Sequence, residues 1–258
     1  MIHASDILGL TRRGAVGEAL PAFLLYALLG EARAATPKGR MAPARWISRQ
    51  DEIARALSAG QMTPLNWCLE VERLGREVDL AELMATVNRS QLTAAPMGSH
   101  NDPKKRNVRF LDASGAPRRL TYGAALFDFE PQNVITPHGH RHMVSAHMVV
   151  GGAFRVRNYD RVGDQAGAMI IRPTRDYVAG LGKVSTMCSA RDNIHWFVPE
   201  GGKKATTFDV ILSGLDAGQP AYDIKAIDAY GGRRRRDGTI VAPIMSFGDS
   251  ARKYTADV

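Results

Sequence analysis

The segment Pro137–His147 reads PHGHRHMVSAH and holds four of the seven histidines of the chain. Residues two apart in an extended strand point to the same side, so His138 and His140 share a face and His142 has the same parity. A fifth histidine, His195, follows in the segment DNIHWF. Neutral imidazole is the commonest metal ligand, and a first-row metal needs three or four converging donors. Five of seven histidines in two short segments favour a metal site over unrelated surface or core histidines.

The sequence around these histidines has the pattern of many short strands. Residues 118–129, 143–150, 153–159 and 206–212 are rich in β-branched and aromatic side chains and are separated by Gly, Pro, Asp or Asn. This spacing predicts a mainly β fold, a barrel or sandwich over residues 100–258 that includes a C-terminal extension. The sequence contains no glycine-rich phosphate loop, no Gly-x-Ser-x-Gly motif and no Cys-x-x-Cys pair.

Residues 41–95 have helical periodicity and predict three short helices that pack on the barrel. Ser48 is the expected N-cap of the first helix. Thr63 followed by proline predicts the start of the second helix, and Gly75 its end. Asp79, with a glutamate three residues later, predicts the start of the third helix through a capping box.

The histidine segment resembles the first motif of the cupin superfamily, in which two histidines one residue apart precede a glutamate and a glycine. Read from His138, the partner is His140, Ser145 takes the glutamate position and Gly152 takes the glycine position. His195 is similar to the single histidine of the second cupin motif, although the proline and glycine expected before it are absent. The resemblance covers residues 107–215 and implies a cupin-like jelly-roll barrel preceded by a short helical segment. It implies His138, His140 and His195 as the metal ligands.

A second alignment of the same motif starts at His140. The partner is then His142 and the glutamate position falls on His147, but the glycine position falls on Phe154. Since only the first alignment places a glycine correctly, it is preferred. Under the second alignment His147 would be a ligand.

The loss of the glutamate leaves three neutral donors, which preserve the +2 charge of a metal ion and leave coordination positions open. Among cupins this pattern is similar to the thiol dioxygenases related to cysteine dioxygenase. Iron(II) is the ion that the resemblance implies, with zinc, manganese and nickel as alternatives.

Other residues near the two motifs are candidates for chemistry. Arg155 and Arg157 share a face of their strand and bind a substrate anion if that face is the inner one. Tyr159 lies on the same face as Arg157 and is a candidate catalytic residue through its phenol. Alternatively, its ring only packs against neighbouring side chains of the sheet. His147 is a candidate catalytic proton carrier. Trp196 or its neighbour is expected to line the pocket, and Trp196 is assigned to substrate binding.

Three functions fit these residues. The first is a metal-dependent dioxygenase acting on a small organic substrate, which could be a thiol. The second is a non-catalytic metal-containing protein that binds or senses a small ligand and closes the metal sphere with a fourth histidine. The third is a metal-free isomerase or sugar-modifying cupin with a histidine base, which the number of clustered histidines disfavours.

Composition is that of a folded chain, with 258 residues, 45% hydrophobic and 23% charged, and a formal net charge of +8. The basic residues are scattered apart from Arg233–Arg236, which adjoins glycines and reads as a solvated loop rather than a nucleic-acid contact. Cys68 and Cys188 do not make a disulfide framework. No apolar stretch has the length of a membrane span. The expected partners are a small substrate, dioxygen for an oxygenase, and a second copy of the chain in a homodimer.

Residues 1–35 resemble a bacterial export signal. The paired arginines of Thr11–Gly14 precede an apolar stretch that ends in Ala32-Arg33-Ala34, as in a twin-arginine signal. Glu18 and Pro21 interrupt that stretch, and the alternative is an amphipathic N-terminal helix in a cytoplasmic protein. The order of segments favours export to the periplasm or beyond.

Overall fold

The structure, a computed structural model, describes residues 40–98, 101–221 and 223–255. The described residues from Met41 onward cluster as one compact unit, and that unit is dominated by two antiparallel sheets. The export signal predicted for residues 1–35 lies outside the described residues. No helix in the described ranges combines the length and the apolarity needed to cross a membrane.

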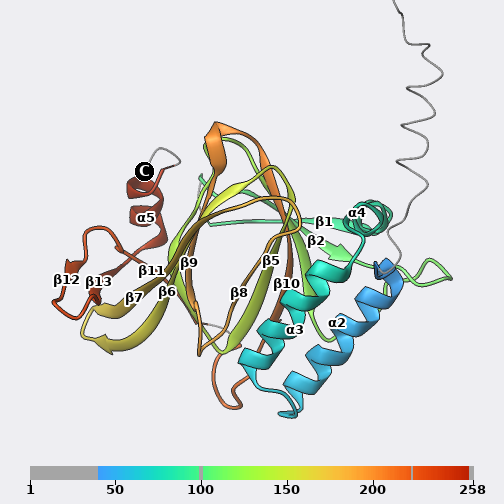
Figure 1. Cartoon of the computed structure of the whole chain (residues 1–258), viewed down its shortest axis with the longest axis horizontal. Helices are drawn as coiled ribbons and strands as arrows, with labels where there is room; N and C mark the ends of the chain where they lie inside the picture. The colour runs from blue at the N-terminus through green and yellow to red at the C-terminus, as the bar shows by residue number, and fades with distance from the viewer. Residues whose placement is uncertain (1–39, 99–100, 222, 256–258) are drawn as a thin grey trace, which may run out of the picture. The chain divides into compact units, whose positions relative to one another are not determined.

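The first sheet has six strands and forms one wall of the barrel (Figure 1). In spatial order they are β1 (Gln91–Ala95), β2 (Lys104–Arg109), β3 (Gly123–Phe129), β10 (Ala205–Ser213), β5 (Met143–Gly151) and β8 (Val184–Met187).

The second sheet has seven strands and forms the facing wall. In spatial order they are β11 (Asp223–Ile227), β4 (Ile135–Arg141), β9 (Ile194–Pro199), β6 (Phe154–Gln165), β7 (Ala168–Ala179), β13 (Ile240–Met245) and β12 (Arg233–Arg234). A 3-10 turn, η1 (Glu200–Gly202), follows β9, and helix α5 (Phe247–Lys253) follows β13.

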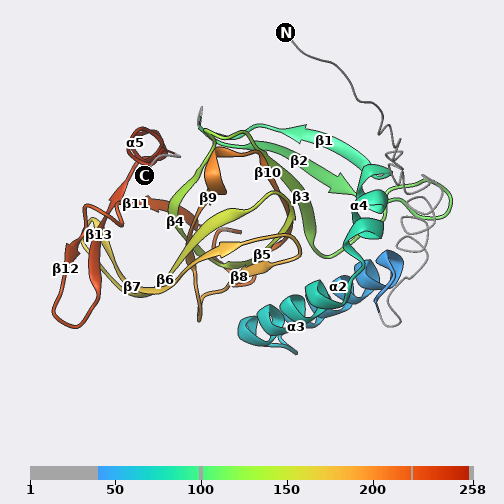
Figure 2. The same ribbon diagram turned by 45° about the horizontal axis from the view of Figure 1, so that its top comes forward.

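The strand order identifies the fold. The central strands of the first sheet run β3-β10-β5-β8 and those of the second run β4-β9-β6-β7, so the chain crosses repeatedly between the two sheets. Only β6 and β7 are neighbours both along the chain and in these central strands. This is the order of a double-sheet jelly roll, and both walls are visible in Figure 2. The mainly β, jelly-roll prediction is therefore confirmed.

Three helices precede the strands, and their ends agree only in part with the sequence prediction. Helix α2 (Pro43–Ser58) begins at a proline in its first turn, so Ser48 lies inside the helix and the predicted cap is wrong. The caps of α3 (Pro64–Glu77) and α4 (Leu80–Asn88) are confirmed. The Thr63 side chain accepts a hydrogen bond from the Asn66 amide, and the Asp79 side chain accepts one from the Glu82 amide.

Gly75 does not end α3, contrary to the prediction, because the helix continues to Glu77. A Cβ at this glycine would collide with the Val184 side chain of β8. The absence of a side chain at Gly75 therefore allows the helix to pack closely against the first sheet, and no local sequence pattern predicts this contact.

The helices cover the outer face of the first sheet (Figure 1). Trp46 of α2 and Trp67 of α3 are fully buried in a core shared with Met148 of β5 and Phe208 of β10. Removing either tryptophan side chain is expected to cost about 3–5 kcal/mol of unfolding free energy. Since neighbouring residues of a strand point to opposite faces, the alternate residues of β5 and β10 point into the barrel. That inner face carries the polar site.

Candidate metal centre

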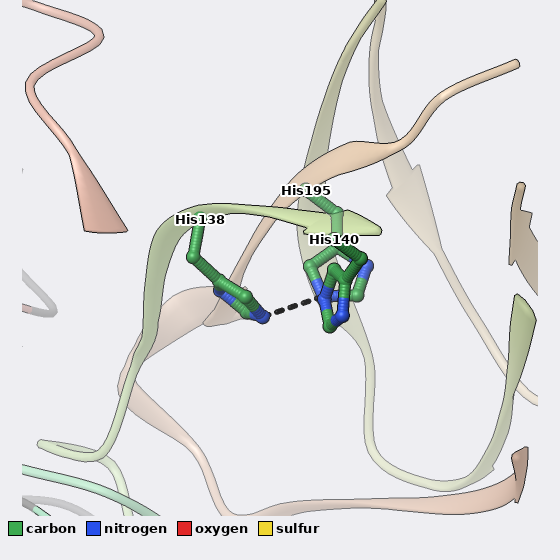
Figure 3. A group of neighbouring side chains, drawn as sticks. All are labelled: His138, His140 and His195. Atoms are coloured by element: carbon green, nitrogen blue, oxygen red, sulfur yellow. Dashed lines mark hydrogen bonds between the residues drawn. The ribbon is translucent and has the colours of Figure 1, made fainter. Parts of the chain in front are cut away.

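Two strands of the second sheet bring three histidines together. His138 and His140 lie two residues apart in β4 and point to the same side, and β4 pairs antiparallel with β9 so that His138 is directly opposite His195. Figure 3 shows the three rings converging. Gly139 between them faces the other side, where a Cβ would lie 3.1 Å from the Ile194 side chain. Strand alternation and one strand pairing thus build the cluster.

The Nε2 atoms of the three rings approach one another closely. The Nε2 atom of His195 lies 3.1 Å from Nε2 of His138 and 3.2 Å from Nε2 of His140. The Nδ1 atom of His138 donates to the carbonyl of Thr136 at 2.7 Å, so in the neutral ring Nε2 carries a lone pair that points into the cluster. The Nδ1 atom of His140 lies 3.2 Å from the sulfur of Met143. These outer contacts fix the rings in place.

Burial keeps these rings neutral. Their exposed fractions are 8% for His138, 6% for His140 and 2% for His195. Burial lowers the pKa of His138 to about 4, and it lowers the pKa of His140 and of His195 well below the ordinary value, with the neighbouring histidines adding to the effect. When the rings are neutral, the lone pairs on their Nε2 atoms point toward one another at these short distances. A single N–H on His195 can donate a hydrogen bond to only one of its two neighbours, so the other contact remains unfavourable.

A divalent cation would resolve this arrangement. Nitrogen donors about 2.1 Å from a shared ion lie roughly 3.0 to 3.4 Å apart, which matches the observed separations. Within the described ranges these three histidines form the single group of His, Cys, Asp and Glu donors close enough to hold a metal, and it contains no carboxylate. The residues therefore fit a divalent transition metal.

A fourth histidine lies beside this cluster without pointing a free nitrogen at it. The His147 ring contacts that of His195, with centroids 4.7 Å apart. Its Nδ1 donates to the carboxylate of Asp209 at 2.7 Å, and its Nε2 lies 2.8 Å from the Ser145 hydroxyl. With Asp209 as acceptor, the neutral ring carries its proton on Nδ1 and accepts from Ser145 at Nε2. Both ring nitrogens of His147 are therefore engaged.

The histidines open onto a cavity of about 530 Å³ inside the barrel. Its other lining residues are largely apolar, and the side chains of the two sheets and of α5 form its walls. They include Phe127, Phe129, Ile135, Phe197, Ile211, Ile224 and Phe247. Such a cavity has the size and character of a site for a small organic molecule.

The alignment that begins at His138 agrees with this geometry. Ser145, at the glutamate position, lines the cavity, and Gly152 has a φ of 65°, where a Cβ would lie 2.5 Å from the Lys204 carbonyl. His142 leaves the strand parity because its own φ is 61°, and its Nδ1 donates to Asp216 at 2.5 Å on the surface side. The expectation that His142 shares the face of the ligand pair is therefore wrong.

The other predicted site residues lie away from the cavity. Phe154, Val156 and Asn158 of β6 are buried, so Arg155 and Arg157 point outward. Arg155 pairs with Asp176 on the surface.

Tyr159 and Trp196 are also on the outer side of the second sheet. Tyr159 lies beyond a bulge in β6 and lines a different pocket together with Arg157. Trp196 is fully buried against Tyr254, and its neighbour Phe197 is the aromatic residue that lines the cavity. The roles assigned to Arg155, Arg157, Tyr159 and Trp196 beside the histidines do not fit this geometry, because strand parity alone leaves the choice of face open.

Two residues of the site carried no sequence prediction. Asp209 is 2% exposed and holds His147, and an acidic residue within the apolar run TTFDVIL is the signal that could have revealed it. Asn158 is directly opposite His195 in the pairing of β6 with β9. The side-chain amide of Asn158 and the Nδ1 atom of His195 are buried without hydrogen-bond partners among the described residues. The two residues are therefore adjacent in the strand pairing, but their side chains form no hydrogen bond with each other.

Comparison with known proteins found no matching family model and no matching curated protein. Among solved structures, an oxalate oxidase aligns over 48% of this chain and 57% of its own length, with 19% identity and a TM-score of 0.34. Vicilin from Capsicum annuum aligns over 51% of this chain and 32% of its own length, with 13% identity and a TM-score of 0.35. KdgF from Halomonas sp. aligns over 48% and 86%, with 14% identity and a TM-score of 0.32. At these scores the similarities carry no argument about function, and the strand order and the histidine geometry stand by themselves.

Proposed function

We propose that this chain is a metal-dependent oxidoreductase of the cupin type, a dioxygenase that acts on a small organic substrate at an iron(II) ion held by His138, His140 and His195. The observation that carries the proposal is the convergence of three buried, neutral imidazoles on the wall of a mainly apolar cavity. Three neutral donors leave the charge of the ion uncompensated, which favours binding of an anionic substrate group such as a thiolate.

The chemistry that iron(II) supplies when bound is Lewis-acid and one-electron redox chemistry. The protein supplies the surroundings. Phe127, Phe129 and Phe197 line the cavity with aromatic carbon, which accepts the apolar part of a substrate. This wall accepts the hydrocarbon part of a compact molecule, and small organic thiols are the first class to test.

The hydrogen-bonded chain from Asp209 through His147 to Ser145 is positioned to contact a polar group of the substrate. Asp209 fixes the proton of His147 on Nδ1, so Nε2 accepts the hydrogen bond from the Ser145 hydroxyl, and the oxygen of that hydroxyl can accept a hydrogen bond from a substrate group. Since all three residues line the cavity, they orient a substrate polar group next to the histidine cluster.

The alternative is a metal-containing protein that binds or senses a ligand without turnover. It requires a fourth protein donor, and His147 is the nearest candidate. Both nitrogens of that ring are occupied by Asp209 and Ser145, which favours the enzyme.

The deciding experiment combines metal analysis with oxygen uptake. Protein purified without chelator is expected to contain about one iron per chain and to consume dioxygen when supplied with a small thiol such as cysteine, cysteamine or 3-mercaptopropionate. Chelation should abolish the uptake and iron(II) should restore it. The His142→Ala variant is the matched control, because that histidine lies in the same segment but bonds to Asp216. Redox-inert zinc held by four protein donors would exclude the dioxygenase.

We further propose that the chain is exported through its twin-arginine-like N-terminus and functions in the periplasm or outside the cell. The order of basic, apolar and small residues in 1–35 supports this. A homodimer is the proposed assembly, and light scattering or analytical ultracentrifugation tests it.

A further inference from the structure

A second pocket lies on the outer face of the second sheet, behind the strands that carry the metal centre. In the pairing of β6 with β9, Asn158 is opposite His195 and Arg157 is opposite Trp196. Because successive residues point to opposite faces, the first pair faces the barrel interior and the second pair faces outward. The outer pocket has a volume of about 300 Å³, and its lining includes Arg157, Tyr159, Arg175, Asp176, Tyr230 and Arg234.

The guanidinium of Arg157 is fixed in position by its neighbours, and its terminal nitrogens are available to bind a ligand. Its guanidinium lies 4.2 Å from the ring centre of the fully buried Trp196 and 5.8 Å from that of Tyr230. Its side chain is 19% exposed, and Nε lies 3.6 Å from the carboxylate of Asp176. In the part of the chain that the structure describes, its two terminal nitrogens form no hydrogen bond. Stacking on aromatic rings fixes the plane of the guanidinium while leaving these donors available.

The lining of the pocket contains three guanidinium groups, those of Arg157, Arg175 and Arg234, and one carboxylate. Arg175 pairs with Asp192 at 3.2 Å, whereas Arg234 forms no ion pair with any described residue. The one carboxylate in the lining, Asp176, is shared with Arg155 outside it.

The Tyr159 hydroxyl adds another donor. Burial raises the pKa of this residue to about 12, so the phenol stays protonated at neutral pH. Tyr230 is 47% exposed, and its ring forms an open aromatic wall of the pocket.

We propose that this pocket binds the phosphate group of a small phosphate monoester, with Arg157, Arg175 and Arg234 around the phosphate and the Tyr230 ring against the organic part. A dianion with three terminal oxygens matches several guanidinium donors better than a carboxylate does. The site lies outside the histidine cavity and does not rest on the metal proposal. It also assigns a role to Arg234, one member of the Arg233–Arg236 run, which is exposed as expected from the sequence.

Calorimetric titration of the full chain at constant ionic strength tests this proposal, with phenyl phosphate and inorganic phosphate as the probes. Phenyl phosphate should bind saturably with one site per chain, and more tightly than inorganic phosphate. Replacing Arg234 by Gln should weaken binding about tenfold, as expected for loss of a charge-assisted contact worth about 1.5 kcal/mol or more. Arg236→Gln removes the same charge from the same run but outside the pocket lining, and its affinity should be unchanged.

A second variant tests the aromatic wall, because Tyr230→Ala should remove the preference for phenyl phosphate. Equal weakening in the Arg234 and Arg236 variants would mean that general surface charge, not the pocket, attracts the anion. Equal affinity of the unmodified chain for both probes would overturn the assignment to an ester. Absence of saturable binding would overturn the site.

Discussion

Replacing His195 by Ala tests the metal centre most directly, because the Nε2 atom of this residue lies within 3.2 Å of those of both other histidines. Metal at 100 times its dissociation constant stabilises the native state by about 2.7 kcal/mol. If the substitution weakens binding at least tenfold, the same metal concentration contributes about 1.4 kcal/mol or less. For a chain of this size about 2–4 °C of melting temperature corresponds to each kcal/mol.

The assay compares melting temperatures with excess iron(II) or manganese(II) and with a chelator. The unmodified chain should gain about 5–11 °C from metal, and the His195→Ala variant no more than about 3–6 °C. His142→Ala should retain the full gain, because that histidine bonds to Asp216 away from the cluster. Far-UV circular dichroism verifies that each variant is folded before metal is added. An undiminished metal-dependent gain in the His195 variant, with full metal occupancy, would refute the ligand assignment.

Four further predictions follow from the same structure. Gly152→Ala should lower the unfolding free energy by about 2 kcal/mol or more in urea titrations, because its φ is 65° and a carbonyl lies 2.5 Å from the added Cβ; Gly167→Ala, with a φ of 69° and open space, should cost only about 1 kcal/mol. The metal-free protein should lose at least about 2 kcal/mol between pH 7 and pH 4.5, since the buried His138 has a pKa of about 4 and the unfolded chain binds its proton already near pH 6.5; a flat profile would contradict this. His147→Ala should keep metal and alter turnover, whereas metal loss equal to that of the first variant would support the alternative motif alignment. Protein isolated from its own host should begin near Ala35 by mass spectrometry, and an intact first methionine on cytoplasmic protein would rule out export.

The parts of the structure that the sequence predicts correctly depend on local physics. The Thr63 and Asp79 caps form because each side chain reaches an amide three residues away. The side-by-side placement of His138 and His140 follows from strand alternation alone. These features require no knowledge of the rest of the molecule.

The incorrect or missing predictions depend on distant contacts. Gly75 has the local signature of a helix end, yet its place is decided by Val184 more than a hundred residues away. The outward direction of Arg157 depends on which face of β6 meets the barrel interior, and parity cannot select a face. The apolar run around Asp209 marks this residue as unusual, but its place beside His147 depends on the pairing of β10 with β5, which puts the two residues directly opposite each other.

The alternation along β9 constrains how this chain can change during evolution. His195 and Trp196 are adjacent in sequence but serve opposite faces of one sheet. A single-residue insertion or deletion in the short connection before β9 would shift the register and exchange the two side chains, which would put indole in the barrel and imidazole against Arg157. Insertions and deletions among homologues of this chain should therefore be rare in that connection. They should be more frequent in exposed turns such as the one at Gly167, where added atoms meet open space.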